Sequence, residues 1–324
     1  MVFMIGNRGH EESKRPARRR TAGAIGAAGA LAALLTLGAC GSSGSGGAPD
    51  TSATGSGAAA PGQVKVVAAF YPLAYAAQQV GGDAVAVTTL TPPGVEPHDL
   101  ELTPSQVAQL QDADIVLYVP GFMPAVDQAV AQQAAGKAVD ASAGIAPLTI
   151  DGAADPHVWL DPENMTVIGA NTATAITRAN PGKTSEVQAN AAAFEGRMAT
   201  LNQQFSTSLS SCKVKDLVVS HAAFGYLASA YGFTQVPIAG LSPETEPSPA
   251  RIAEVSDLVR NDGVTTVYYE TLVDPKVAET VAKESGARTS VLDPIEGLTE
   301  GSDQTYQSLM EANLKALVAG QGCA

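Results

Sequence analysis

Four side chains in this sequence have the types that could together hold a transition-metal ion. They are His98, His157, His221 and Asp293. Three imidazoles and a carboxylate can form a closed tetrahedral shell of the kind that suits Zn²⁺. The gaps between them are far longer than in a local metal-binding motif, so spacing alone does not show that the four meet. Each residue also has an ordinary interpretation, because a single loop histidine is usually solvated and an aspartate before a proline can cap a helix.

The positions of these residues relative to the predicted elements favour a shared cleft. His221 and Asp293 each directly follow a short apolar run, which places both at the carboxyl end of a predicted strand. Clefts in parallel α/β sheets open at those ends. His98 and His157 each follow a proline in a predicted loop.

Short β-branched runs alternate with helical segments along most of the chain. The predicted strands cover residues 64–70, 84–90, 114–118, 217–219, 235–238, 265–269 and 289–292. Such alternation is typical of parallel sheets with helices packed on their faces. A helix predicted over 184–210 has apolar residues spaced mostly by three and four, and it would span about 40 Å. We therefore predict an α/β fold with an N-terminal lobe over 63–183, a connecting helix over 184–211 and a C-terminal lobe over 212–324.

Residues 1–39 have the features of a secretory signal. A basic group that includes Arg15 and Arg18 precedes an apolar run, which ends in Leu37-Gly38-Ala39-Cys40. This pattern is similar to a bacterial lipobox and predicts lipidation of Cys40. Cleavage by an ordinary signal peptidase and an uncleaved anchor are the alternatives. The Gly- and Ser-rich residues 40–62 are predicted to form a flexible tether, so we expect an extracytoplasmic protein anchored to the bacterial cell membrane.

The net charge of the chain bears on which partners it can bind, and its cysteines bear on whether it contains a disulfide. The net charge is −13, and the predicted signal carries six basic and two acidic residues, which leaves about −17 on the body. Such an acidic body argues against a nucleic-acid partner and is compatible with a cationic ligand. Beside Cys40, the chain has Cys212 and Cys323 as an even pair. Export to an oxidising compartment favours a disulfide between them over two buried thiols.

Four ordered blocks, each containing one candidate ligand, point to a known family. They are Leu90–Asp99, Asp155–Pro162, Val219–Leu227 and Leu292–Leu298. In these blocks the chain resembles the cluster A-I solute-binding proteins of zinc and manganese ABC importers, the ZnuA/TroA-like family. The resemblance implies two α/β lobes joined by one rigid helix. It also implies that His98 and His157 bind the metal from the N-terminal lobe, and His221 and Asp293 from the C-terminal lobe.

The type of residue at His221 bears on which metal is bound. In the family that this chain resembles, this ligand is often glutamate in manganese-specific members and histidine in zinc members. Imidazole suits zinc, whereas manganese favours carboxylate and carbonyl oxygen. We therefore expect Zn²⁺ as the transported ligand, with manganese or iron as the alternative. Many zinc members have a histidine-rich loop between the first two ligands, and here no histidine lies between His98 and His157.

The resemblance implies a monomeric protein that captures Zn²⁺ and delivers it to the ABC permease subunits in the membrane. A zinc hydrolase is one alternative, but catalytic zinc needs an open coordination position, and the chain has no His-Glu-x-x-His or Gly-x-Ser-x-Gly motif. We therefore predict that the protein is not an enzyme. A sugar or peptide importer subunit is an alternative, but sugar sites usually need aromatic side chains on which the sugar stacks. The only tryptophan, Trp159, lies in the His157 block. A surface adhesin has no repeat or adhesive tract to support it.

Overall fold

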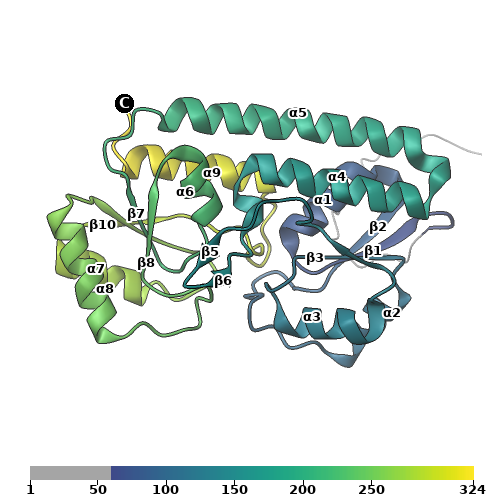
Figure 1. Ribbon diagram of the computed structural model, residues 1–324, viewed down its shortest axis with the longest axis horizontal. Coiled ribbons are helices and arrows are strands. Elements are labelled where there is room, and N and C mark those ends of the chain that lie inside the picture. The colour runs from purple at the N-terminus through teal and green to yellow at the C-terminus, as the bar shows by residue number, and fades with distance from the viewer. Residues whose placement is uncertain (1–59) are drawn as a thin grey trace, which may run out of the picture. The chain divides into compact units, whose positions relative to one another are not determined.

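The structure is a computed structural model that describes residues 60–324 (Figure 1). The predicted signal, Cys40 and most of the predicted tether lie outside the described residues. Two parallel four-stranded sheets with helices on both faces confirm the predicted α/β fold class. Within residues 60–324, no helix combines the length and the apolar character that are needed to cross a bilayer.

The first sheet has the strand order β2-β1-β3-β4, with every pair parallel. Its strands are β1 (Val64–Ala68), β2 (Val85–Thr89), β3 (Ile115–Tyr118) and β4 (Ala138–Asp140). Helices α1 (Tyr71–Gly81) and α4 (Pro162–Ala179) lie on one face of this sheet (Figure 1). Helices α2 (Pro104–Asp112) and α3 (Pro124–Ala129) lie on the other face.

The second sheet repeats this order as β10-β9-β7-β8, again with every pair parallel. Its strands are β7 (Asp216–Val219), β8 (Thr234–Pro237), β9 (Thr266–Tyr269) and β10 (Arg288–Val291). Helices α6 (Gly225–Tyr231) and α9 (Tyr306–Gly320) lie on one face, and α7 (Pro249–Asn261) and α8 (Lys276–Ser285) on the other (Figure 1). In each sheet the strand order reverses beside the first strand, so the β1/β3 and β7/β9 junctions are the topological switch points where α/β sheets bind ligands.

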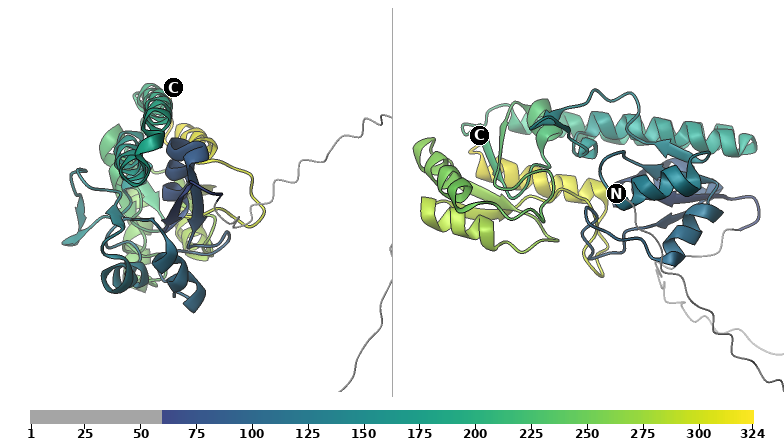
Figure 2. Two further views of the ribbon diagram at one scale, coloured as in Figure 1. Left: turned by 90° about the vertical axis from the view of Figure 1, so that its right-hand side faces the viewer. Right: turned by 60° about the horizontal axis from the view of Figure 1, so that its bottom comes forward.

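Helix α5 (Thr184–Leu209) has 26 residues and runs alongside both lobes (Figures 1 and 2). At 1.5 Å per residue it is about 39 Å long. It packs against α1 and α4 in the first lobe and against α6 and α9 in the second. One face is buried, and its residues are Val187, Phe194, Met198, Leu201, Phe205 and Leu209. The helix predicted from the apolar spacing is confirmed to within one residue at its C-terminal end.

The two lobes share one apolar core. A continuous cluster of buried side chains includes Phe70 and Leu117 from the first sheet region, and Leu217 and Tyr268 from the second. A smaller cluster is confined to the second lobe and includes Val255 of α7. Because the larger cluster crosses between the lobes, opening them widely would expose apolar surface to water.

Several short elements complete the described body. A hairpin is formed by β5 (Thr149–Ile150) and β6 (Ala153–Ala154). The remaining helical turns are η1 (Gly82–Ala84), η2 (Val130–Ala134), η3 (Val158–Leu160) and η4 (Pro181–Lys183). A disulfide joins Cys212, which follows α5, to Cys323, which follows α9.

Candidate metal centre

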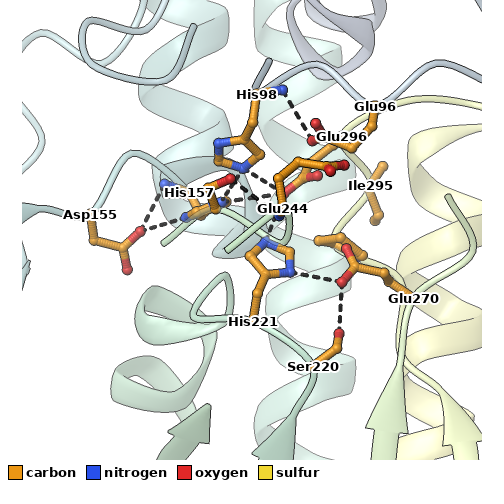
Figure 3. A network of polar contacts seen from close by, with 12 residues as sticks. Glu96, His98, Asp155, His157, Ser220, His221, Glu244, Glu270, Ile295 and Glu296 are labelled. Carbon is orange, nitrogen blue, oxygen red and sulfur yellow. Dashed lines mark hydrogen bonds and ion pairs between the residues drawn. The ribbon is translucent and has the colours of Figure 1, made fainter. Parts of the chain in front are cut away.

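Three histidines and one glutamate meet between the lobes (Figure 3). They are His98, His157, His221 and Glu296, and one ligand atom from each lies within 4.8 Å of the others. His98 and Glu296 are 7% and 1% exposed, and the other two are fully buried. The sequence predicted the three histidines, and the structure brings them together from both lobes.

The spacing of the donor atoms matches a small tetrahedral shell. The Nε2 atoms of His98 and His157 are 3.3 Å apart. Oε1 of Glu296 lies 3.5 Å from Nε2 of His98, 3.3 Å from Nε2 of His157 and 3.2 Å from Nε2 of His221. A tetrahedron with metal–ligand bonds of about 2.0 Å has edges of about 3.3 Å. Glu296 and each histidine, and the pair His98 and His157, are therefore at the separations of a tetrahedral zinc site, and all four donors lie within 4.8 Å of one another.

The switch point of the second sheet explains the position of His221. This residue follows β7, and Glu270 directly follows β9, the neighbouring strand. Because parallel strands end at the same edge, the two side chains meet there. Nδ1 of His221 lies 2.9 Å from Oε1 of Glu270, which also accepts a hydrogen bond from the Ser220 hydroxyl at 2.7 Å. Glu270 is 3% exposed, and sequence reasoning did not identify it, although it satisfies the strand-end rule that identified His221.

A second acid holds His157 in the same way. Nδ1 of His157 lies 2.8 Å from Oδ1 of Asp155, and this oxygen also accepts from the His157 backbone N–H at 2.9 Å. An ionised carboxylate only accepts hydrogen bonds, so each acid fixes the proton on Nδ1 and leaves Nε2 free for the metal. Figure 3 shows both acids behind their rings. The motif Asp-Pro-His offered a signal for Asp155, which is buried.

The local charges keep a proton in the cluster when no metal is bound. Burial opposes a charge on His221, but the carboxylates of Glu270 and Glu296 outweigh this and raise its pKa to about 10. Burial also opposes a charge on His157, but hydrogen bonds to Asp155 and Glu296 raise its pKa. For Glu296, burial is outweighed by the charge of His221 and by hydrogen bonds from the histidines, which lower its pKa well below its usual range. The centre therefore stabilises positive charge.

The predicted fourth ligand, Asp293, is replaced in this group by Glu296. The Asp293 carboxylate accepts from the Thr271 hydroxyl and from the Ile295 backbone N–H, both at 2.7 Å. Those bonds hold the Asp293 carboxylate against Thr271, which follows β9, and against its own loop, whereas Glu296, three residues later, points at the histidines (Figure 3). Both acids lie in the Leu292–Leu298 block, and the sequence did not distinguish them.

The loop that carries Glu296 is held in an unusual backbone conformation. Ile295 has a φ of 56°, a left-handed value that a β-branched residue rarely adopts. It is fully buried, and the bond to Asp293 fixes its backbone N–H. The indole N–H of Trp159 donates to the Pro294 carbonyl at 2.7 Å. Trp159 is buried, and its indole bond connects the His157 loop to the one bearing Glu296.

Solvent reaches the centre beside His98. A surface pocket of about 180 Å³ is lined by residues that include His98, Asp99, Phe122, Pro156 and Leu241. His98 is the most exposed of the four candidate ligands. A partly hydrated ion would therefore meet His98 first.

Comparison with known proteins shows that the chain is similar to proteins described as zinc-uptake or zinc-binding. Residues 66–320 match the family described as zinc-uptake complex component A, periplasmic. The zinc-binding lipoprotein AdcA of Streptococcus pneumoniae is 35% identical over 286 residues, which cover 80% of this chain and 56% of AdcA. The chain thus spans little more than half the length of the AdcA relatives that it matches.

Two further similarities extend over nearly the whole of the matched protein. The high-affinity zinc uptake system protein ZnuA of Bacillus subtilis is 33% identical over 292 residues, covering 83% of this chain and 91% of ZnuA. The crystal structure of the Zn(II)-bound ZnuA-like domain of S. pneumoniae AdcA is 36% identical, with a TM-score of 0.71. That similarity covers 80% of this chain and 99% of the domain.

Proposed function

This chain belongs to the family of periplasmic zinc-uptake complex component A, and on that premise we propose that it captures Zn²⁺ outside the cytoplasm for an ABC importer. The proposed ligands are His98, His157, His221 and Glu296. The observation that carries the proposal is their spacing across the lobes, because Oε1 of Glu296 in the second lobe lies 3.5 Å from Nε2 of His98 and 3.3 Å from Nε2 of His157 in the first.

The donor set favours zinc over manganese. Three of the four donors are imidazole nitrogens, which suit zinc, whereas manganese prefers oxygen ligands and usually takes more of them. The acids behind His157 and His221 fix their rings in the ligating orientation and increase their basicity as ligands.

A transport role fits the centre better than catalysis. Catalytic zinc has three protein ligands and keeps a fourth position for water. Here a carboxylate lies within 3.5 Å of all three Nε2 atoms, so it occupies the position that a reactive water would need. Full enclosure by protein donors suits an ion that is transported rather than one that takes part in catalysis.

Capture and release follow from the ligands' distribution over both lobes. His98 and His157 precede α5 in the chain, and His221 and Glu296 follow it. A bound ion therefore links the lobes, and it leaves only when at least one lobe's donors withdraw. We propose that docking to the membrane permease separates the ligand loops, starting at His98, which is the most exposed of the four.

The N-terminal segment is proposed to keep the protein at the membrane. Residues 1–39 would be removed as a signal, Cys40 would carry lipid, and residues 40–62 would tether a monomeric metal-binding body. The support is the lipobox-like Leu37–Cys40 sequence and the Gly/Ser-rich composition after it.

Native mass spectrometry with elemental analysis, on protein purified from its own cell envelope, tests the proposed cargo. We expect one zinc per chain and little manganese or iron. A strain that lacks the protein should grow poorly when zinc is chelated and recover with the parent gene, but not with a gene encoding His157→Ala. Manganese or iron in the purified protein, or full recovery with the variant, would contradict the proposal.

A further inference from the structure

Asp155, which holds His157, is itself in contact with the opposite lobe. One carboxylate oxygen, Oδ1, is used by the ring and the backbone N–H of His157. The other, Oδ2, is buried and has no hydrogen-bond partner among the described residues. It is directed at Gly225, the first residue of α6 in the second lobe.

Gly225 leaves no room for a side chain. A Cβ atom built at this position would lie only 2.4 Å from Oδ2 of Asp155, well inside the closest normal contact. The carboxylate could not move aside without disturbing its two bonds to His157. Glycine is thus required here by the approach of an acid from the other lobe.

The next residue of α6, Tyr226, is hydrogen-bonded to the segment that contains Asp155. The Tyr226 hydroxyl accepts a hydrogen bond from the Leu148 backbone N–H at 3.0 Å and donates one to the Asp155 carbonyl at 3.3 Å. The Asp155 N–H in turn donates to the Leu148 carbonyl at 2.9 Å. The base of the hairpin that precedes His157 is therefore bonded to α6, which begins four residues after His221.

We propose that α6 positions His157 across the lobe boundary, with Gly225 and Tyr226 acting as positioning residues and Asp155 as the group through which they act. A ligand of the first lobe is then oriented by the second lobe, so any movement of α6 away from residues 148–155 would loosen His157 and weaken metal binding. The inference rests on the proposed function, because it assumes that His157 binds the ion.

A double-mutant cycle tests the proposal on the full chain. Zinc dissociation constants would be measured by competition with a chromophoric chelator for the parent, Gly225→Ala, Asp155→Ala and the double variant. Loss of a group that orients a metal ligand typically costs 10- to 100-fold in affinity. We expect a loss of about tenfold for Gly225→Ala and of about 10- to 100-fold for Asp155→Ala. The double variant should bind like Asp155→Ala alone, because the new methyl group then has no carboxylate to displace.

Matched controls separate positioning from general destabilisation. Gly196 lies on an exposed part of α5 with open space around it, so Gly196→Ala should bind zinc like the parent. Tyr226→Phe provides a second test if Gly225→Ala does not fold, and it should also weaken zinc binding. Its control is Tyr231→Phe on the same helix, whose hydroxyl bonds Asn202 of α5 instead.

The outcomes distinguish this inference from the proposed function. If Gly225→Ala or Tyr226→Phe binds zinc like the parent, or if the losses of Gly225→Ala and Asp155→Ala multiply in the double variant, the inference is wrong. If His157→Ala itself binds zinc like the parent, the proposed site is wrong, and the inference fails with it.

Discussion

At the scale of single residues, the orientation of the imidazoles depends on the acids behind them. Asp155 and Glu270 each hold the Nδ1 proton of a histidine, so the opposite nitrogen faces the centre. Glu296 then supplies the negative charge inside the shell. Affinity for zinc is therefore expected to depend on three carboxylates as well as on three imidazoles, although Glu296 is the only one of those carboxylates that we propose as a ligand.

The two acids of the loop after β10 should differ in their effect on zinc binding. Glu296→Gln and Asp293→Asn each remove one negative charge from this loop without changing side-chain size. We expect Glu296→Gln to weaken binding by at least about tenfold, because it removes a charged ligand from a closed site. Asp293→Asn should bind nearly like the parent, because the amide oxygen can still accept from the Ile295 N–H while the amide NH2 donates to the Thr271 hydroxyl, which can also accept. Calorimetry with chelator competition would show the difference, and the reverse ranking would restore Asp293 as the ligand.

Zinc binding should release protons. His221 in the metal-free protein has a pKa of about 10, so it is protonated at pH 7 to 9 and must lose that proton to coordinate. The apparent zinc affinity of the protein should therefore rise from pH 7 to pH 9, because fewer protons then compete with zinc for His221. Calorimetry at pH 8 in buffers of different ionisation enthalpy should show release of about one proton or more per ion. Heats that do not depend on the buffer would show that the cluster holds no such proton.

At the scale of elements, helix α9 fixes the loop that bears Glu296. The Asn313 side chain accepts from the Asp293 N–H at 2.8 Å and donates to the Asp293 carbonyl at 2.7 Å. The Asn313 amide thus bonds the Asp293 backbone as a neighbouring strand would. These two bonds hold the start of the loop that follows β10. The disulfide lies beyond the other end of α9, where Cys323 is bonded to Cys212.

Removing the disulfide should lower stability and leave zinc binding intact. A bond across 111 residues of separation restricts the unfolded chain strongly, by up to about 4–5 kcal/mol in the chain-entropy model. We expect the double variant Cys212→Ser, Cys323→Ser to unfold at a lower urea concentration, with its zinc affinity within about threefold of the parent. Alkylation without reductant should leave both cysteines of the parent unmodified. Two free thiols in protein from the cell envelope would contradict the pairing.

At the scale of the whole described body, the lobes are held together by apolar packing that does not depend on the metal. Helix α5 packs on both lobes, and the shared core extends beneath it. Under the proposed function, a bound metal would add one more link between the lobes, because its ligands come from both. A wide opening of the lobes on metal loss is not expected, because the shared core would have to be exposed.

Hydrogen exchange should show a local response to zinc. We expect zinc to protect the backbone around its four ligands, His98, His157, His221 and Glu296, while the centre of α5 stays protected in both states. Small-angle scattering should give nearly the same radius of gyration with and without zinc. Rapid exchange at the centre of α5 in the metal-free protein, or a large change in radius, would show that the lobes hinge freely.

The sequence by itself determined the α/β class, the long helix and the three histidines. Apolar runs mark buried parallel strands regardless of their partners, and the place of His221 at a strand end follows from them. His98 and His157 lie in loops, and they were identified by the resemblance of their blocks to the family. Strand β4 was not predicted, because its three residues are only half-buried and carry little apolar pattern.

Only the tertiary structure decided the acids of the site. Asp293 and Glu296 lie three residues apart in one loop, and their directions depend on the positive φ of Ile295 and on bonds from Asn313 and Trp159. Those partners lie 20 or more residues away in the chain from the residues that they bond, and Trp159 comes from the other lobe. Side-chain direction in an irregular loop is set by such remote contacts, because the loop has no regular period from which its buried side could be read.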